Sequence, residues 1–396
     1  MSVKRLALLA MAAVGALAAT ASPAFALSAT ADTSAWEVNG KVRALALSGN
    51  TLYVGGKFGL LRAQGGTPKI KLKSVGKIDA TTGVGIPGWG PIVTTSTGAA
   101  GQVNALAVSA DGSTLYIGGK FDFINGTPAK NFAAVSTSTG AVDPAFSHAF
   151  GNQVWVINVG PNLIYVGGAF KQVDGQAEGN IVALNQDGSV NTTFAAVANN
   201  NVRSMAFAPD GNTLFVGGNF TTMDGVSRVS VARIDPNSGA LDPWAVPSGI
   251  IVAPQVGWTL LPVGNRLYGG FGRGPNYAAA FRLDNGTVGS LVWRVSTAGN
   301  DESMAMSPDG TRLFIGGHMG TAVLTQTFCG QPVHGLYSVN PATGAVYCDW
   351  FPAITPFGSN FTGAWAMMKS GSNLYVGGLI DAINGVPHAN LVRFPM

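Results

Sequence analysis

The stretch LFVGGNFTTMDGVSRVSVARIDPNSGALDPW, residues 214–244, contains the pattern that the rest of the chain repeats. An apolar run ends in two glycines, a turn with Asp224-Gly225 follows, and a second apolar run leads through Pro-Asn-Ser-Gly to Trp244. Asp-Gly between apolar runs is a strong hairpin signal, because both central residues of such a turn adopt positive φ. With the preceding apolar stretch VRSMAFA, 202–208, the pattern predicts four short antiparallel strands per unit.

The apolar run with its glycine pair occurs seven times along the chain. The copies read LYVGG, LYIGG, IYVGG, LFVGG, LYGG, LFIGG and LYVGG, with the first glycine at positions 55, 118, 167, 217, 269, 316 and 377. These intervals are close to the period of propeller blades, and four short strands without helical periodicity describe one blade. We therefore predict an all-β fold, a seven-bladed β-propeller of four-stranded antiparallel blades. The glycine pairs predict close backbone approach between neighbouring blades.

The two ends of the chain each carry part of one unit. LVRFPM, residues 391–396, stops after the third expected strand of the last unit. DTSAWEV, residues 32–38, has no strand before it, and its Trp36 matches the aromatic residue that ends the other units, namely Trp89, Phe146, Phe194, Trp244, Trp293 and Trp350. We expect the ring to be closed by this N-terminal strand joining the C-terminal blade, which pairs two sheet edges that would otherwise stay open.

Residues 1–26 have the form of a signal peptide. Lys4 and Arg5 precede the apolar run LALLAMAAVGALAA, and Ala24-Phe25-Ala26 is a small-x-small cleavage site. The apolar run is short for a membrane-spanning helix. We expect a signal peptide at 1–26 and a propeller domain at 27–396. The mature protein is then secreted and extracellular, with no membrane insertion once the signal is removed.

The charge of the chain gives no support for a nucleic-acid partner. There are 23 basic and 19 acidic residues, and removal of the leader takes away two of the basic ones. No cluster of Lys or Arg stands out, so electrostatic capture of nucleic acid or of an anionic membrane is not supported. The 55 glycines and the 46% of hydrophobic residues are typical of a turn-rich globule with a large core. We expect a monomer.

Two cysteines, Cys329 and Cys348, are present in a chain expected to reach an oxidising compartment. A structural disulfide between them is the prediction, because exported proteins favour disulfides, and a pair of free thiols is the alternative. A metal site at these cysteines is not supported, since only His334 lies nearby in the sequence.

The units resemble a known repeat family. LFVGGNFTTMDGVSRVSVARIDPNSGALDPW and IYVGGAFKQVDGQAEGNIVALNQDGSVNTTF, residues 164–194, resemble the delta-60 repeat of secreted bacterial β-propellers, within the WD40-like and quinoprotein-like propeller superfamily. The likeness covers nearly the whole mature chain, although copy five lacks the Asp-Gly hairpin and copy six is longer. The resemblance implies the fold and no activity, because the family has no shared catalytic motif.

Turns such as IDATTGVGIPGW, residues 78–89, resemble the tryptophan-docking turn of quinoprotein propellers. This second resemblance implies that the tryptophans lock adjacent blades together. It does not imply a quinone cofactor, because those enzymes need an adjacent cysteine pair that this chain does not have.

Residues that could carry catalysis are few. The four histidines, His148, His318, His334 and His388, are scattered without metal-ligand spacing, and the sequence has only three glutamates. Most aspartates lie in turn sequences such as SADG and APDG, where they favour local hydrogen bonds. We predict no catalytic residue, no bound metal and no cofactor, with Ca²⁺ as the one ion left open.

One departure from the repeat marks a candidate site. Copies one to five place Val42, Val103, Val154, Val202 and Val256 at one position of the strand expected to line the central channel. Copy six has Asp301 there, followed by Glu302 where other copies have Arg43, Asn104, Trp155 and Arg203. We predict a ligand-binding site for a cation or a sugar at the channel mouth, formed by Asp301, Glu302, Arg43, Trp155 and Arg203. A solvated loop end is the alternative.

These features favour an exported, non-catalytic binding module whose partner is an extracellular glycan or protein. A carbohydrate-active enzyme, a glycosidase or a lyase, is one alternative, because glycoside hydrolysis uses a pair of carboxylates. Asp301 and Glu302 are adjacent, however, and neighbouring residues of a strand point to opposite faces. A purely structural module is the other alternative. The sequence therefore does not decide whether the protein is an enzyme, but it favours a protein without enzymatic activity.

Overall fold

The computed structural model describes residues 28–283, 286, 288–319, 326–355 and 362–396. The predicted signal peptide at 1–26 lies outside the described residues. Strands account for the regular structure of these ranges, apart from one 3₁₀ helix, Pro144–Phe146. Within them, no helix has the length and apolar character needed to cross a membrane.

Seven antiparallel sheets contain the repeated strands, and we call them the first to seventh sheet in chain order. The first sheet consists of β2 (Lys41–Ser48), β3 (Thr51–Lys57) and β6 (Val75–Asp79). The second consists of β8 (Gln102–Val108), β9 (Thr114–Lys120) and β12 (Phe132–Ser136). The third consists of β13 (Val154–Val159), β14 (Leu163–Gly168) and β17 (Ile181–Asn185). The fourth is β18 (Val202–Phe207), β19 (Leu214–Gly218) and β22 (Val231–Ile234). The fifth sheet consists of β23 (Val256–Val263), β24 (Arg266–Gly272), β25 (Tyr277–Arg282) and β26 (Leu291–Ser296). The sixth consists of β27 (Asp301–Met306), β28 (Leu313–Gly317) and β31 (Leu336–Val339). The seventh consists of β33 (Gly363–Ser370), β34 (Asn373–Leu379) and β37 (Leu391–Pro395).

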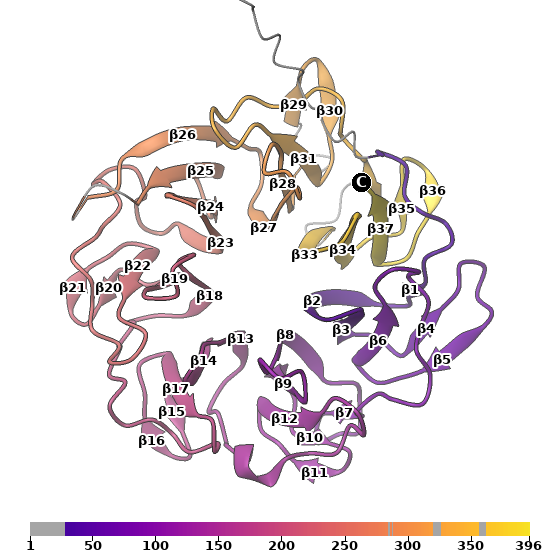
Figure 1. Ribbon diagram of the computed structural model, residues 1–396, viewed down its shortest axis with the longest axis horizontal. Helices are drawn as coiled ribbons and strands as arrows, with labels where there is room; N and C mark the ends of the chain where they lie inside the picture. The colour runs from indigo at the N-terminus through magenta and orange to yellow at the C-terminus, as the bar shows by residue number, and fades with distance from the viewer. Residues whose placement is uncertain (1–27, 284–285, 287, 320–325, 356–361) are drawn as a thin grey trace, which may run out of the picture.

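The first strand of each sheet lies innermost, and these strands surround a common centre (Figure 1). In the order β2, β8, β13, β18, β23, β27 and β33, each is in contact with the next, and β33 is in contact with β2. Short outer strands cover the rim, namely β1 (Glu37–Val38), β4 (Leu60–Arg62), β5 (Lys69–Lys71), β7 (Val93–Thr94), β10 (Phe123–Ile124), β11 (Thr127–Pro128), β15 (Gln172–Val173), β16 (Gln176–Ala177), β20 (Thr222–Met223), β21 (Val226–Ser227), β29 (Gln326–Phe328), β30 (Gln331–Val333), β32 (Ile354–Thr355), β35 (Ala382–Ile383) and β36 (Val386–Pro387).

Among the described residues, the expected fourth strand is regular only in the fifth sheet, where β26 pairs with β25. In five other sheets the corresponding segment makes one isolated bridge, the pairs being Ile78 with Gly85, Val135 with Val142, Leu184 with Val190, Ile234 with Leu241 and Val339 with Val346. Pro87, Pro144 and Pro243 stand two residues after three of these bridges. The residue before each proline donates its N–H to the ladder, so the proline occupies the alternate position that faces away from the sheet, as is typical of an edge strand.

The glycine pairs have two separate roles. A Cβ added at Gly55 would lie 2.7 Å from Val103 Cγ1 of the next sheet, and one at Gly118 would lie 2.5 Å from Val154 Cγ1. The first glycine therefore permits the close approach between neighbouring sheets that the sequence predicts. The second glycine, such as Gly56, instead faces the backbone of its own inner strand, where a Cβ would overlap the Lys41 carbonyl oxygen.

Side chains tie each sheet to the following one. Trp89 Nε1 donates to the Ser136 carbonyl at 3.2 Å, and Trp293 Nε1 donates to the Pro341 carbonyl at 2.9 Å. Each pair joins neighbouring sheets, so tryptophan docking between adjacent sheets is confirmed at these positions. The tyrosine of the second strand does the same, as Tyr165 OH donates to the Pro236 carbonyl at 2.6 Å.

The N-terminal segment 28–38 meets the seventh sheet. The backbone N–H of Asp32 donates to the Arg393 carbonyl at 2.8 Å, and that of Ser28 donates to the Pro395 carbonyl at 3.3 Å. The strand β1, however, pairs with β4 and not with β37. The predicted N-terminal fourth strand is therefore not formed as a regular strand of the seventh sheet, although the segment lies along it.

The predicted disulfide is confirmed. Cys329 and Cys348 are bonded, with their Cα atoms 5.7 Å apart. Cys329 lies in the turn between β29 and β30, and Cys348 precedes the buried Trp350. The bond therefore fastens the longer loop of copy six to the outer edge of the sixth sheet.

Candidate functional site in the central cavity

A β-bulge interrupts every inner strand near its start. The register shifts between Val42 and Ala44 in β2, and equivalent shifts occur in the other six inner strands. A bulge leaves one residue without a cross-strand partner and turns its side chain out of the alternation. The bulged residues, one from each sheet, are Arg43, Asn104, Trp155, Arg203, Trp258, Glu302 and Trp365.

All seven bulged residues line one cavity of about 310 Å³, together with Asn300 and His318. We call it the central cavity. A second space of about 270 Å³ continues from it along the inner strands, between small and aliphatic residues such as Ala44, Ala105 and Val156. The repeated bulge thus gathers polar and aromatic side chains around the central cavity, and several of them also line the second space.

Four of the five predicted site residues, Arg43, Trp155, Arg203 and Glu302, line the central cavity. Asp301 does not, because its side chain points to the other face of β27 and is completely buried. Tyr337 OH donates to Asp301 Oδ1 at 3.2 Å, and Thr297 Oγ1 lies 3.0 Å from Oδ2. Burial raises the pKa of Asp301 to about 8, against the opposing effect of these hydrogen bonds. The two adjacent acids therefore do not form a carboxylate pair.

Both arginines stack on tryptophans. The guanidinium carbon of Arg203 lies 3.9 Å from the ring centroid of Trp155 and 5.0 Å from that of Trp258. The guanidinium carbon of Arg43 lies 4.5 Å from the ring centroid of Trp365. Burial lowers the pKa of Arg203 to about 10, and Glu302 opposes this effect, so the side chain is charged at neutral pH. Each guanidinium therefore lies over an aromatic face, an arrangement stabilised by cation–π attraction.

Several N–H groups at this level have no acceptor among the described residues. They are Nε of Arg43 and of Arg203, and Nε1 of Trp155 and of Trp258. No hydrogen bond and no ion pair joins either guanidinium to a described residue. Buried polar groups are normally paired, so a group of unpaired donors around one cavity calls for a functional explanation.

His318 connects the remaining polar groups. Its Nδ1 lies 2.9 Å from the Thr362 carbonyl oxygen, and Trp365 Nε1 donates to its Nε2 at 2.9 Å. Glu302 Oε1 lies 3.3 Å from the same Nε2 and accepts from Asn300 Nδ2 at 3.3 Å. Burial lowers the pKa of His318, but the hydrogen bond and charge of Glu302 outweigh it, so the pKa lies above the ordinary value. A neutral ring with its proton on Nδ1 donates to Thr362 and accepts from Trp365, whereas the charged ring can donate from Nε2 to Glu302 in place of accepting from Trp365.

Five cavity residues are not among the predicted site residues, namely Asn104, Trp258, Asn300, His318 and Trp365, although the sequence analysis places Asn104 at the equivalent position of its unit. Trp258 is missed because copy five is shifted by one residue, so that Gly257 and not Val256 takes the position of Val42. In copy five the second glycine of the pair, Gly270, is therefore the one that faces the next sheet, because a Cβ added to it would overlap the Asp301 carbonyl oxygen. His318 follows the glycine pair of copy six directly. Copies one and two have Lys57 and Lys120 there, which are exposed and do not line the cavity, so the repeat gives no signal for His318.

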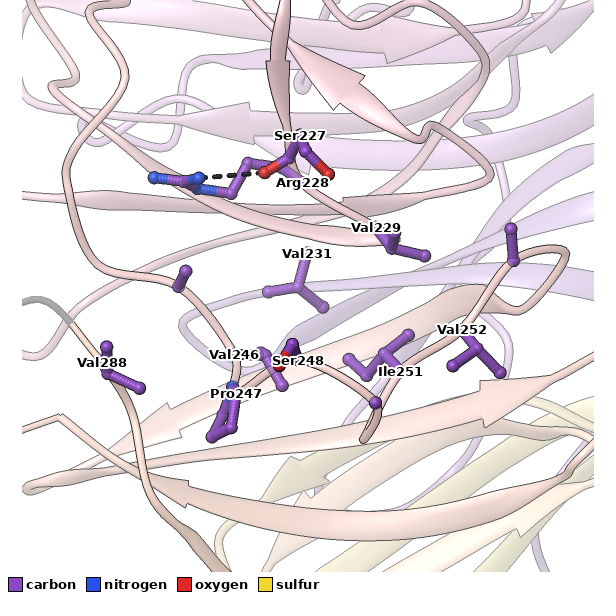
Figure 2. A pocket seen from close by; sticks show the side chains of 13 residues that line it. Ser227, Arg228, Val229, Val231, Val246, Pro247, Ser248, Ile251, Val252 and Val288 are labelled. Carbon is purple, nitrogen blue, oxygen red and sulfur yellow. Dashed lines mark hydrogen bonds between the residues drawn. The ribbon is translucent and has the colours of Figure 1, made fainter.

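A larger cavity of about 700 Å³ lies on the outer side, between the fourth and fifth sheets. Figure 2 shows that its walls are aliphatic, with Val229, Val231, Ile251 and Val252 around the space. The guanidinium of Arg228 is already used, since it donates to the carbonyl oxygens of Ser227, Asp242 and Pro243. This cavity is larger than the central one, but its described lining has only three polar side chains, Ser227, Arg228 and Ser248, and no aromatic ring.

The described residues contain no group of three or more His, Cys, Asp or Glu side chains arranged to hold a metal ion. The sequence analysis left open whether Ca²⁺ binds, and these ranges contain no such group of side chains that could hold it. Glu302 is the one acidic side chain among the described residues of the central cavity, where two arginines accompany it.

Comparison with known proteins identifies the fold. Residues 164–194 and 208–243 match a family model described as a domain of unknown function (DUF5122) beta-propeller. A search of curated proteins found no match. The crystal structure of the WD40 beta propeller domain of Doa1 is similar, with a TM-score of 0.55 and 13% sequence identity over 91% of this chain and 95% of that chain. Identity this low shows the fold alone, and the propeller resemblance of the sequence is confirmed.

Proposed function

We propose that this β-propeller protein is an exported, non-catalytic binding module that takes part of an extracellular glycan into the central cavity. The observation that carries the proposal is the convergence of seven bulged side chains, one from each sheet, on a single space. Three tryptophans supply apolar faces, while arginine, asparagine, glutamate and histidine supply hydrogen-bonding groups. A hydroxylated ring needs this combination of flat apolar contact and several oriented polar partners.

The size of the cavity favours a glycan over a folded protein surface. A space of about 310 Å³ holds a group of the size of one or two sugar rings. A protein partner would have to insert a single side chain or a chain end. Export is proposed from the signal-peptide pattern at 1–26, and N-terminal sequencing of protein collected outside the cell should give Leu27 as the first residue.

We also propose that the seven sheets are the blades of a closed seven-bladed propeller, with the N-terminal segment in the fourth-strand place of the last blade. Three contacts support this closure. Tyr375 OH donates to the Ala80 carbonyl at 3.0 Å, as Tyr165 does to Pro236 between the third and fourth sheets. Asn390 Nδ2 donates to the Val38 carbonyl at 3.1 Å, and Gly377 packs against Val42. A closed ring holds the seven bulges in fixed positions around the ligand.

Two observations favour binding over the alternative of a glycosidase or lyase. Acid–base hydrolysis uses two carboxylates that face one site, and Asp301 points away from the cavity that Glu302 lines. His318 is also a poor general base, because both ring nitrogens already have partners in Thr362 and Trp365.

The test is a glycan array followed by calorimetry on the bound glycans. We expect Trp155→Ala and Trp258→Ala to weaken binding at least about tenfold while the protein stays folded, since stacking contacts of this kind are among the main contributors to affinity. Val252→Ala, in the outer cavity, is the matched control and should bind as the wild type does. Equal binding by all variants would place the ligand elsewhere, and release of shortened sugar products would make the protein an enzyme.

A further inference from the structure

We propose that the ligand of the central cavity carries a monoanionic oxyanion, a carboxylate or a sulfate ester on a sugar ring, which is bound between Arg43 and Arg203. The inference rests on the proposed function, because it specifies the chemistry of the glycan that this site takes. It starts from the charge balance of the cavity. Two guanidiniums face one carboxylate there, so the site has an excess of positive charge even when His318 is neutral.

Neither arginine is neutralised within the protein. Glu302 is close enough to affect the pKa of both guanidiniums, yet it forms an ion pair with neither, its partner being His318 at 3.3 Å. A partly buried cation that no anion contacts directly is costly to hold in place. An anionic ligand would remove that cost, which gives the cavity a physical preference for anions.

The geometry of the two guanidiniums suits an oxyanion. The face of Arg203 is taken by Trp155 and Trp258, and a face of Arg43 is taken by Trp365. Contact with a ring face does not use the N–H groups of a guanidinium, and neither side chain donates a hydrogen bond to a described residue, so these groups remain for a ligand. The edge of a guanidinium is the part that binds two oxygens of one carboxylate or sulfate side by side.

Glu302 limits the charge of the ligand and supplies an acceptor. A dianionic phosphate would be repelled by this carboxylate more strongly than a monoanion. Glu302 can instead accept from a hydroxyl group of the ring that bears the anion, while the amides of Asn104 and Asn300 already have partners in the protein and help to hold the cavity wall. The set of cavity residues therefore fits an acidic sugar better than a free phosphate group.

The first experiment uses a matched pair of probes, an oligogalacturonide of three residues and the same oligosaccharide after reduction of its carboxyl groups to alcohols. Binding is measured by calorimetry at constant ionic strength, and a sulfated trisaccharide distinguishes the second source of the anion. We expect the wild type to bind an acidic form at least about tenfold more tightly than the reduced form, because charge-assisted hydrogen bonds to arginine would be lost.

Variants test whether the arginines are responsible. Arg43→Gln and Arg203→Gln should each weaken binding of the acidic probe at least about tenfold and leave any binding of the neutral probe within about twofold. Arg294→Gln removes the same charge from an exposed position on β26 and should change neither. Glu302→Gln should tighten binding of the acidic probe, a gain that misfolding cannot produce.

The remaining outcomes separate failure of the oxyanion proposal from failure of the glycan proposal. If the neutral probe binds as well as the acidic one and the arginine variants affect both equally, the oxyanion is excluded while glycan binding stands. If no oligosaccharide binds, acetate and sulfate are titrated alone with tryptophan fluorescence as the readout. A response that is lost in Arg43→Gln and Arg203→Gln keeps the oxyanion site and overturns the glycan proposal. The absence of any response overturns both.

Discussion

Replacing Asp301 by asparagine should stabilise the protein, and the gain should grow as the pH rises from about 4 to about 8. The carboxyl group is completely buried, and burial raises its pKa to about 8. The neutral acid fits its surroundings, because Tyr337 OH donates to Oδ1 and the Thr297 hydroxyl can donate to the Gly299 carbonyl at 2.9 Å while accepting from the acid. Asparagine reproduces both contacts, with its amide N–H groups donating to Thr297.

The magnitude follows from the two pKa values. A folded-state pKa above the unfolded value of about 3.9 means that the proton is bound more tightly in the folded protein. The stability of the wild type is then unaffected below the lower value, falls as the pH rises between the two, and is constant above about 8. At pH 7 the loss is on the order of 4 kcal/mol, because each pH unit between the values contributes about 1.4 kcal/mol.

The assay is urea unfolding of wild type and Asp301→Asn under non-reducing conditions at pH 4, 6, 7 and 9. The two proteins should be similar at pH 4 and should differ most at pH 9. Asp309→Asn is a control of opposite sign. Burial is the largest single effect on the pKa of Asp309 and raises it, but the hydrogen bonds from Ser307 and Thr311 together lower it overall, so that variant should be the less stable one at neutral pH. A difference between wild type and Asp301→Asn that does not change between pH 4 and 9 would refute the reasoning.

Three further outcomes are expected. Replacing Cys329 and Cys348 by serine should lower the free energy of unfolding by about 3 kcal/mol in denaturant titration, because the disulfide closes a loop across a sequence separation of 19. Asn390→Ala should cost about 1–3 kcal/mol in the same assay, since it leaves the Val38 carbonyl without its donor, and an unchanged midpoint would argue against ring closure at this contact. Acidic ligands should bind more tightly as the pH falls through the raised pKa of His318, because the imidazolium adds positive charge to the cavity, and His318→Gln should remove this step from the calorimetric pH profile.

Part of the candidate site can be predicted from the sequence because the repeat supplies its own alignment. Arg43, Trp155, Arg203 and Glu302 occupy equivalent positions after an apolar residue, and they line one cavity. Trp258 is missed because copy five is shifted by one residue, which only the pairing of Gly257 with Phe271 reveals. The direction of the side chains also depends on the bulges, which the apolar pattern does not show.

The sequence by itself determines the local structure and its repetition. Turn residues such as Asn125, Asp174 and Asp224 have φ values of 53°, 51° and 52°, and the Asx-Gly pairs encode these turns within a few residues. Only the tertiary structure decides that Asp301 meets Tyr337, and that seven bulged residues, each from a different unit, surround one space. The physical reason is that hairpins depend on neighbours in the chain, whereas the cavity and its unpaired charges depend on how separate sheets pack around a common centre.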